Sequence, residues 1–223
     1  MGNNELLKVH DWIFLNELSI NYAKSKYLLT GKKIQSNLAE DFLVTLLGNH
    51  QIKREQSVKY LGVIVDEKLN WLSHLKQIET KLAFASSVIY KTRNILPLNT
   101  LKLLYYSFAY TYLSYCVTAW GSATTSHLKP IHVKQNNILR NMTFSNYDAQ
   151  VSPTYKRWNF LKAQDIYKLE LTKLMDKFHN GLLPNIFNGL FQRYSDLHNY
   201  NTTYASNPNY FIPSVHSKNM AKS

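Results

Sequence analysis

Paired carboxylates are the residues of this chain whose type and spacing could serve phosphoryl transfer. That reaction needs carboxylates that converge on two metal ions about 4 Å apart. The adjacent acids are Glu40-Asp41 and Asp66-Glu67, and neither pair has a third acid beside it in an apolar hairpin. We interpret both pairs as solvated loop charges, and we predict no catalytic residue and no metal site. The eight histidines form no His-Glu-x-x-His arrangement, and the single cysteine, Cys116, excludes a disulfide framework and a zinc knuckle.

Basic residues are concentrated in the middle of the chain, which carries a formal net charge of +12. Residues 70–147 hold eight Lys or Arg and a single acid, Glu79. Neutralising such a surface with a polyanion releases counterions, so RNA, DNA or an RNA–DNA hybrid is the expected partner. The alternative is a basic face that serves solubility alone. The expected nucleic-acid contacts are Lys76, Lys81, Lys91, Arg93, Lys134 and Arg140.

The elements that would position these residues are mostly helical. β-branched and aromatic residues predict a strand over Val58–Val65, interrupted by Gly62 as a bulge or close approach, and Asn70 would cap a helix starting at Trp71. Apolar residues at helical spacing predict that this helix buries one stripe. The same spacing predicts a buried helix over Leu101–Trp120. Further predicted elements are helices over Asn4–Leu18, Thr124–Met142 and Ala163–Asn180, and a strand over Lys26–Thr30.

The predicted fold class is α+β, mostly α, with short N-terminal strands followed by a helical bundle and an irregular tail. The segment 31–51 is ambiguous, and from about residue 197 the composition turns to Asn, Thr, Ser and Pro. No small-molecule pocket is evident, and a membrane role is not expected because polar residues interrupt Leu101–Trp120. The N-terminus shows no signal peptide, which favours the cytoplasm or nucleus.

Four segments together resemble the C-terminal part of reverse transcriptases from non-LTR retrotransposons of the LINE or jockey-like kind. VKYLGVIVDEKLNWLSHL (Val58–Leu75) is similar to a family pattern Y-L-G-V-x-[IL]-D-x-x-L-x-W-x-x-H, which begins at the primer-grip hairpin. LNELSINYAKSKYLLTG (Leu15–Gly31) is similar to a segment of the polymerase palm. The other two are Ile89–Gly121, with Leu-Pro, Tyr-Cys and Trp-Gly in family order, and His127–Thr143, with Gln135 followed by Arg140. The resemblance extends over nearly the whole chain.

This resemblance implies a partial palm with a primer-grip-like hairpin (1–69), a thumb-like helical region (70–196) and an extended or disordered tail (197–223). Leu61 and Gly62 would lie in the primer grip, where backbone approaches the primer terminus. Lys24 would match a palm lysine that assists the departing pyrophosphate. The basic helices would grip the template–primer duplex through its phosphates.

The chain departs from the family in lacking the catalytic Tyr/Phe-x-Asp-Asp hairpin and the earlier metal-binding aspartate. The resemblance therefore implies a fragment of an RNA-directed DNA polymerase that binds nucleic acid but is inactive alone. No cofactor is expected for this chain, because Mg²⁺ is expected only for the complete polymerase. Two alternatives are a domesticated, non-catalytic nucleic-acid-binding module and a protein-interaction helical module.

Overall fold

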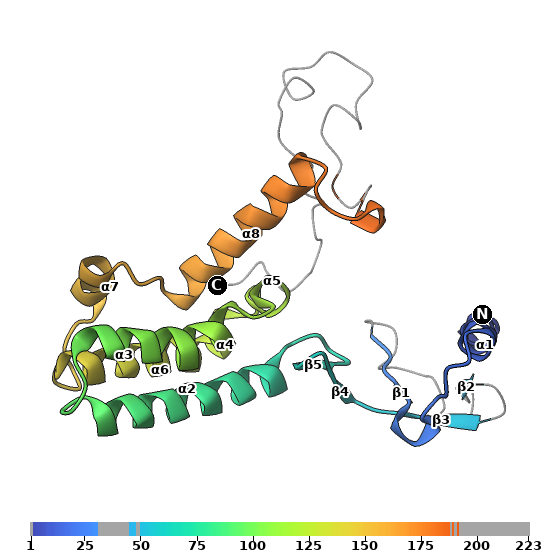
Figure 1. Ribbon diagram of the computed structural model, residues 1–223, viewed down its shortest axis with the longest axis horizontal. Coiled ribbons are helices and arrows are strands. Elements are labelled where there is room, and N and C mark those ends of the chain that lie inside the picture. Colours follow the sequence, from blue (N-terminus) through green and yellow to red (C-terminus); the bar gives the residue numbers. More distant parts are fainter. Residues whose placement is uncertain (1, 31–44, 48–49, 188, 190, 192–223) are drawn as a thin grey trace, which may run out of the picture. The chain divides into compact units, whose positions relative to one another are not determined.

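The computed structural model describes residues 2–30, 45–47, 50–187, 189 and 191 (Figure 1). Within this part of the chain the fold is mostly helical, with short strands near the N-terminus, which confirms the predicted fold class. The predicted tail at 197–223 and most of the ambiguous segment at 31–51 lie outside the described residues. Contacts divide the chain into two compact units, Met1–Glu170 and Leu171–Ser223. The three predicted domain boundaries stay predictions.

The N-terminal elements form one helix and a small mixed sheet. Their bounds are α1 (Gly2–Leu15), the 3-10 helix η1 (Tyr22–Lys24), β1 (Lys26–Tyr27), β2 (Thr45–Leu47) and β3 (His50–Arg54). β3 lies in the centre, parallel to β1 and antiparallel to β2. The helix agrees with the prediction, whereas the predicted strand Lys26–Thr30 is only two residues long, because pairing with β3 ends at Tyr27.

A separate hairpin follows the sheet, and it corrects the prediction of one bulged strand. β4 (Ser57–Tyr60) pairs with β5 (Val63–Asp66), and Tyr60 is opposite Val63. Leu61 and Gly62 therefore form a two-residue turn, with φ of 46° and 87°. Positive φ at both turn positions is the type I′ geometry, whose twist matches that of the flanking strands. Gly62 is therefore a turn residue, not a bulge.

The remainder of the described chain is helical. Its elements are α2 (Leu72–Thr92), α3 (Leu98–Tyr105), the π-helical segment η4 (Tyr106–Tyr110), α4 (Thr111–Ser114), α5 (Val117–Trp120), α6 (Thr125–Thr143), α7 (Ser152–Trp158), α8 (Ala163–His179) and the 3-10 helix η5 (Asn185–Phe187). The ranges of α6 and α8 agree with the helices predicted from sequence. α2 packs against both α6 and α3, and this packing forms the main core (Figure 1).

The apolar stripe of α2 is buried as predicted. Its members are at most 3% exposed, and they are Leu75, Ile78, Leu82, Ala85 and Ile89. Burying a Leu or Ile side chain fully contributes about 1.5–3 kcal/mol, so this stripe is a principal source of stability. The helix starts at Leu72 and not at Trp71, because Trp71 has a left-handed φ of 65°. The N-cap residue is therefore Trp71, which makes no side-chain cap hydrogen bond, and not Asn70 as predicted. The side-chain oxygen of Asn70 does accept from the Leu72 N–H at 3.0 Å.

The predicted single helix over Leu101–Trp120 is wrong in two respects. Cys116 has a left-handed φ of 50° and separates α4 from α5. The buried positions also differ from an α-helical stripe, because they recur every four residues: Leu101, Tyr105, Ala109, Leu113 and Val117. The π-helical segment explains the steps from Tyr105 to Ala109 and Leu113, whereas Val117 follows the break at Cys116. The wider i→i+5 turns of this segment keep residues four apart on one face, where an α-helix would rotate them away.

A buried glutamine ties α6 to its neighbours. Gln135 is fully buried, and its amide nitrogen donates to the Tyr105 hydroxyl at 2.9 Å and to the Leu161 carbonyl at 2.8 Å. Its amide oxygen accepts from the Ala163 N–H at 3.0 Å. One side chain thus joins α3, α6 and the start of α8. The family pattern contains this glutamine, and the structure gives it a structural role.

Candidate nucleic-acid interface

The hairpin is fixed to the helical bundle by one contact at its turn and one on its second strand, β5. The Tyr115 hydroxyl donates to the Leu61 carbonyl at 2.5 Å, and the Ile64 N–H donates to Nδ1 of His74 at 3.4 Å. The backbone of Tyr115 is fixed in turn, because its carbonyl accepts a hydrogen bond from the Trp120 indole N–H at 2.9 Å. The turn residue Leu61 nevertheless stays 72% exposed. The tip is therefore held in place while its side chain remains open to a partner.

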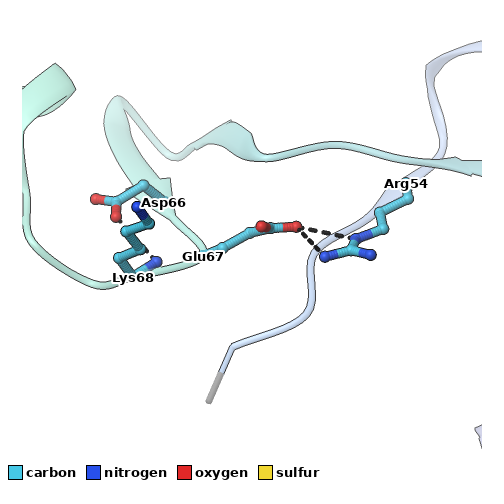
Figure 2. A network of polar contacts seen from close by, with 4 residues as sticks. All are labelled: Arg54, Asp66, Glu67 and Lys68. Atoms are coloured by element: carbon cyan, nitrogen blue, oxygen red, sulfur yellow. Dashed lines mark hydrogen bonds and ion pairs between the residues drawn. The ribbon is translucent and has the colours of Figure 1, made fainter. Parts of the chain in front are cut away.

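The acidic pair Asp66-Glu67 shapes the connection between the hairpin and α2, and our interpretation of it as solvated loop charges is wrong. The Asp66 carboxylate accepts from three backbone N–H groups, those of Lys68, Asn70 and Trp71, at 2.9–3.2 Å. Glu67 accepts from Arg54 Nε at 2.9 Å and lies 2.8 Å from its Nη2 (Figure 2). Both carboxylates thus serve the fold. The other acidic pair, Glu40-Asp41, lies outside the described residues.

His74 is the buried polar centre of this junction. It is 4% exposed, and its ring meets Trp120 edge-on with ring centroids 6.1 Å apart. Burial lowers the pKa of His74, so the neutral ring is favoured at neutral pH. Since Nδ1 accepts from Ile64, the proton of the neutral ring lies on Nε2. Among the described residues, Nε2 has no hydrogen-bond partner.

A cavity of about 440 Å³ opens where the hairpin, α2 and α4 meet. Lys59 and Gly62 line it from the hairpin, His74 and Lys81 from α2, and Tyr115 from the end of α4. The sequence alone gave no indication of a pocket, because these residues converge only through long-range contacts. The one feature of the sequence that pointed to this region was the Trp-x-x-His spacing of Trp71 and His74, which also occurs in the family pattern.

The three predicted lysines of α2 are all exposed, but they do not form one patch. Lys81 lines the cavity, and its Nζ lies 5.9 Å from the centroid of the Tyr112 ring. Lys76 and Lys91 lie on the side of α2 opposite its buried stripe, about 22 Å apart along the axis at 1.5 Å per residue. They suit contacts with phosphates that are well separated along a duplex.

The other three predicted contacts are engaged within the protein. Lys134 lies 3.7 Å from Glu79. Arg93 lies against two aromatic rings, with its guanidinium carbon 4.3 Å from the Tyr90 centroid and 4.8 Å from that of Phe144. Arg140 donates from Nε to the Ala149 carbonyl and from Nη1 to Asn137.

Lys24 lies in η1, which packs against β3, and its side chain is exposed. It does not line the cavity. In the described part of the chain, no three His, Cys, Asp or Glu residues lie close enough to hold a metal ion. No described helix is long and apolar enough to cross a lipid bilayer.

Comparison with known proteins supports the resemblance. The chain is 29% identical over 140 residues to the RNA-directed DNA polymerase from mobile element jockey of Drosophila melanogaster. Over 134 residues it is 25% identical to the probable RNA-directed DNA polymerase from transposon X-element of the same organism. The chain is distantly similar to non-LTR retrotransposon reverse transcriptases.

This similarity is partial on both sides. The matches cover 60% and 59% of the chain, less than the nearly complete span expected from its motifs, and the chain spans only 14% of the length of either curated relative. No protein-family model matches the chain. No solved structure matches it either.

Proposed function

We propose that residues 57–143 bind the template–primer duplex of a non-LTR retrotransposon reverse transcriptase, as a primer grip followed by a thumb. The observation that carries the proposal is the hairpin turn, which projects an exposed Leu61 from a rigid attachment to a strongly basic helical region. The similarity to two RNA-directed DNA polymerases supports it independently. Duplex phosphates would meet Lys76 and Lys91, whose spacing suits two separate contacts and carries no sequence preference.

The test is salt-dependent binding of a labelled RNA–DNA hybrid, measured by fluorescence anisotropy with the 223-residue chain. We expect binding at low salt that weakens steeply between about 50 and 200 mM, because phosphate contacts release counterions. The double variant Lys76→Gln/Lys91→Gln should flatten the slope of log K against log salt by about 2, or roughly one per lost contact.

Lys8→Gln is the matched control, because Lys8 is exposed and its charge is paired with Glu5 at 2.9 Å on α1. It should leave the slope unchanged. Absence of binding at low salt, or an equal effect of the control and the double variant, would contradict the proposal.

We further propose that this chain extends no primer by itself. Its sequence contains no Tyr/Phe-x-Asp-Asp hairpin to hold the Mg²⁺ ions that the complete polymerase uses. A primer-extension assay with magnesium should therefore show no incorporation. Incorporation above background would mean that other carboxylates of the chain serve this chemistry.

A protein-interaction module is the second candidate, and one observation favours it. α1 exposes large apolar side chains, with Trp12 60%, Phe14 77% and Leu15 80% exposed. Contiguous exposed apolar surface commonly marks a protein contact. A chain that self-associates through α1 and binds no hybrid at low salt would favour this candidate over duplex binding.

A further inference from the structure

We infer that the cavity between the hairpin, α2 and α4 binds a single nucleoside phosphate. Its volume of about 440 Å³ lies within the range of small-molecule sites, which is about 300–1,000 Å³. The cavity is also distinct from the exposed face of α2 that carries Lys76 and Lys91. A cavity of this size accommodates one nucleotide, whereas the exposed face of α2 would contact several successive phosphates of a duplex.

The charge of the cavity wall selects an anion. Lys59 and Lys81 line it from opposite elements, the hairpin and α2, and none of the described residues around it is acidic. His74 adds a donor, because its Nε2 carries the proton, is buried, and has no partner among the described residues. Two cations and one neutral N–H donor form a set that suits a phosphate group.

The rest of the wall suits a flat, partly polar group attached to that anion. The rings of Tyr112 and Tyr115 line the cavity and offer stacking surface for a base or sugar. Gln77 also lines it, and its amide oxygen is buried with no partner among the described residues. This amide oxygen can accept a hydrogen bond from a base amine or a sugar hydroxyl, whereas a phosphate dianion has no donor to offer it. Among aromatic anions, the choice of a nucleoside phosphate rests on the proposed function.

Calorimetric titration of the 223-residue chain tests the inference with AMP, adenosine, inorganic phosphate and benzoate. We expect AMP to bind at least about tenfold more tightly than each of the other three, because only AMP uses both parts of the wall. Benzoate binding as tightly as AMP, or AMP showing no binding, would overturn the inference.

Variants locate the binding. Lys81→Gln should weaken AMP at least about tenfold, as expected for the loss of one charged hydrogen bond. Lys129→Gln is the matched control, since it removes the same charge from an exposed position on α6 outside the cavity. Tyr112→Leu should weaken AMP but not inorganic phosphate. Equal effects of Lys81→Gln and Lys129→Gln would overturn the inference.

A competition experiment distinguishes two possible ligands of the cavity, the phosphate-bearing end of a nucleic-acid strand and a free nucleotide. Displacement of AMP by a short single strand that ends in a phosphate, and not by the same strand ending in a hydroxyl, would identify the ligand as a strand terminus. Failure of both strands to displace AMP would identify a free nucleotide. Hybrid binding without AMP binding would overturn this inference and leave the proposed function standing. AMP binding without hybrid binding would overturn the proposed function and leave this inference standing.

Discussion

Replacing Gln135 by methionine tests whether the buried amide holds the helical bundle together. Methionine has a similar length and no hydrogen-bonding amide, so the substitution removes three hydrogen bonds with little change in volume. The Tyr105 hydroxyl, the Leu161 carbonyl and the Ala163 N–H would each lose their bond to Gln135. Leaving a buried polar group unpaired costs about 1–3 kcal/mol.

The expected loss is about 3–5 kcal/mol, because the Leu161 carbonyl is only partly buried and can regain some solvation. This is a large fraction of the 5–15 kcal/mol that is typical of a folded domain. Urea denaturation followed by tryptophan fluorescence measures it, since Trp120 is buried in the same core. Gln164→Met, at an exposed position near the start of α8, is the matched control and should change stability by less than about 0.5 kcal/mol.

A double-mutant cycle separates the Gln135–Tyr105 bond from the rest. Tyr105→Phe in the Gln135→Met background removes the second unpaired group, so it should cost less than Tyr105→Phe in the native protein. A loss below about 1 kcal/mol for Gln135→Met would show that the three partners find other contacts. The structural role of this family residue would then be refuted.

Two further predictions concern the junction between hairpin and bundle. Burial lowers the pKa of His74 in the folded chain, so as the pH falls below about 6.5 the unfolded chain takes up the proton before the folded chain does. The free energy of unfolding should therefore decline from about pH 6.5 toward the pKa of the folded state. His74→Gln should reduce that decline in denaturation curves compared at about pH 7.5 and 5.5. Leu61→Asn should stabilise the protein by about 0.5–1 kcal/mol in thermal unfolding, because Asn tolerates the left-handed φ of 46° better than Leu and gives the Asn-Gly pair that type I′ turns favour. An unchanged or lower melting temperature would argue against a strained turn.

Periodic patterns predicted the long helices well, and local patterns failed where distant contacts decide the structure. The α2 stripe, α6 and α8 follow directly from apolar spacing, because each helix buries one face whatever its neighbours are. The residue pattern missed the turn at Leu61, and only the family resemblance implied a hairpin there. Leucine is not a residue expected at left-handed φ, and the Tyr115 contact that holds the turn comes from 54 residues away. Asp66 resembles any exposed loop acid in sequence, but its carboxylate organises the backbone that follows it.

Backbone strain occurs at the junction that holds the cavity, as well as at Glu17, Phe144 and Asn159. Four non-glycine residues at this junction have left-handed φ angles: Leu61, Leu69, Trp71 and Cys116. Each such residue costs about 1–2 kcal/mol, and it persists only where the surrounding contacts determine the conformation. Asp66 supplies such contacts for the loop, and Tyr115 supplies one for the turn.

This strain argues that the position of the hairpin tip matters beyond folding. A hairpin that served stability alone could use Asn-Gly in its turn and a relaxed connection to α2, both of which are less strained. The chain instead holds an exposed leucine at a strained turn position, next to a cavity with two lysines and a buried histidine. Strain of this kind characteristically lies at ligand sites, where it fixes a geometry in advance of binding. Under the proposed function, the hairpin tip and the cavity would form two parts of one preorganised site.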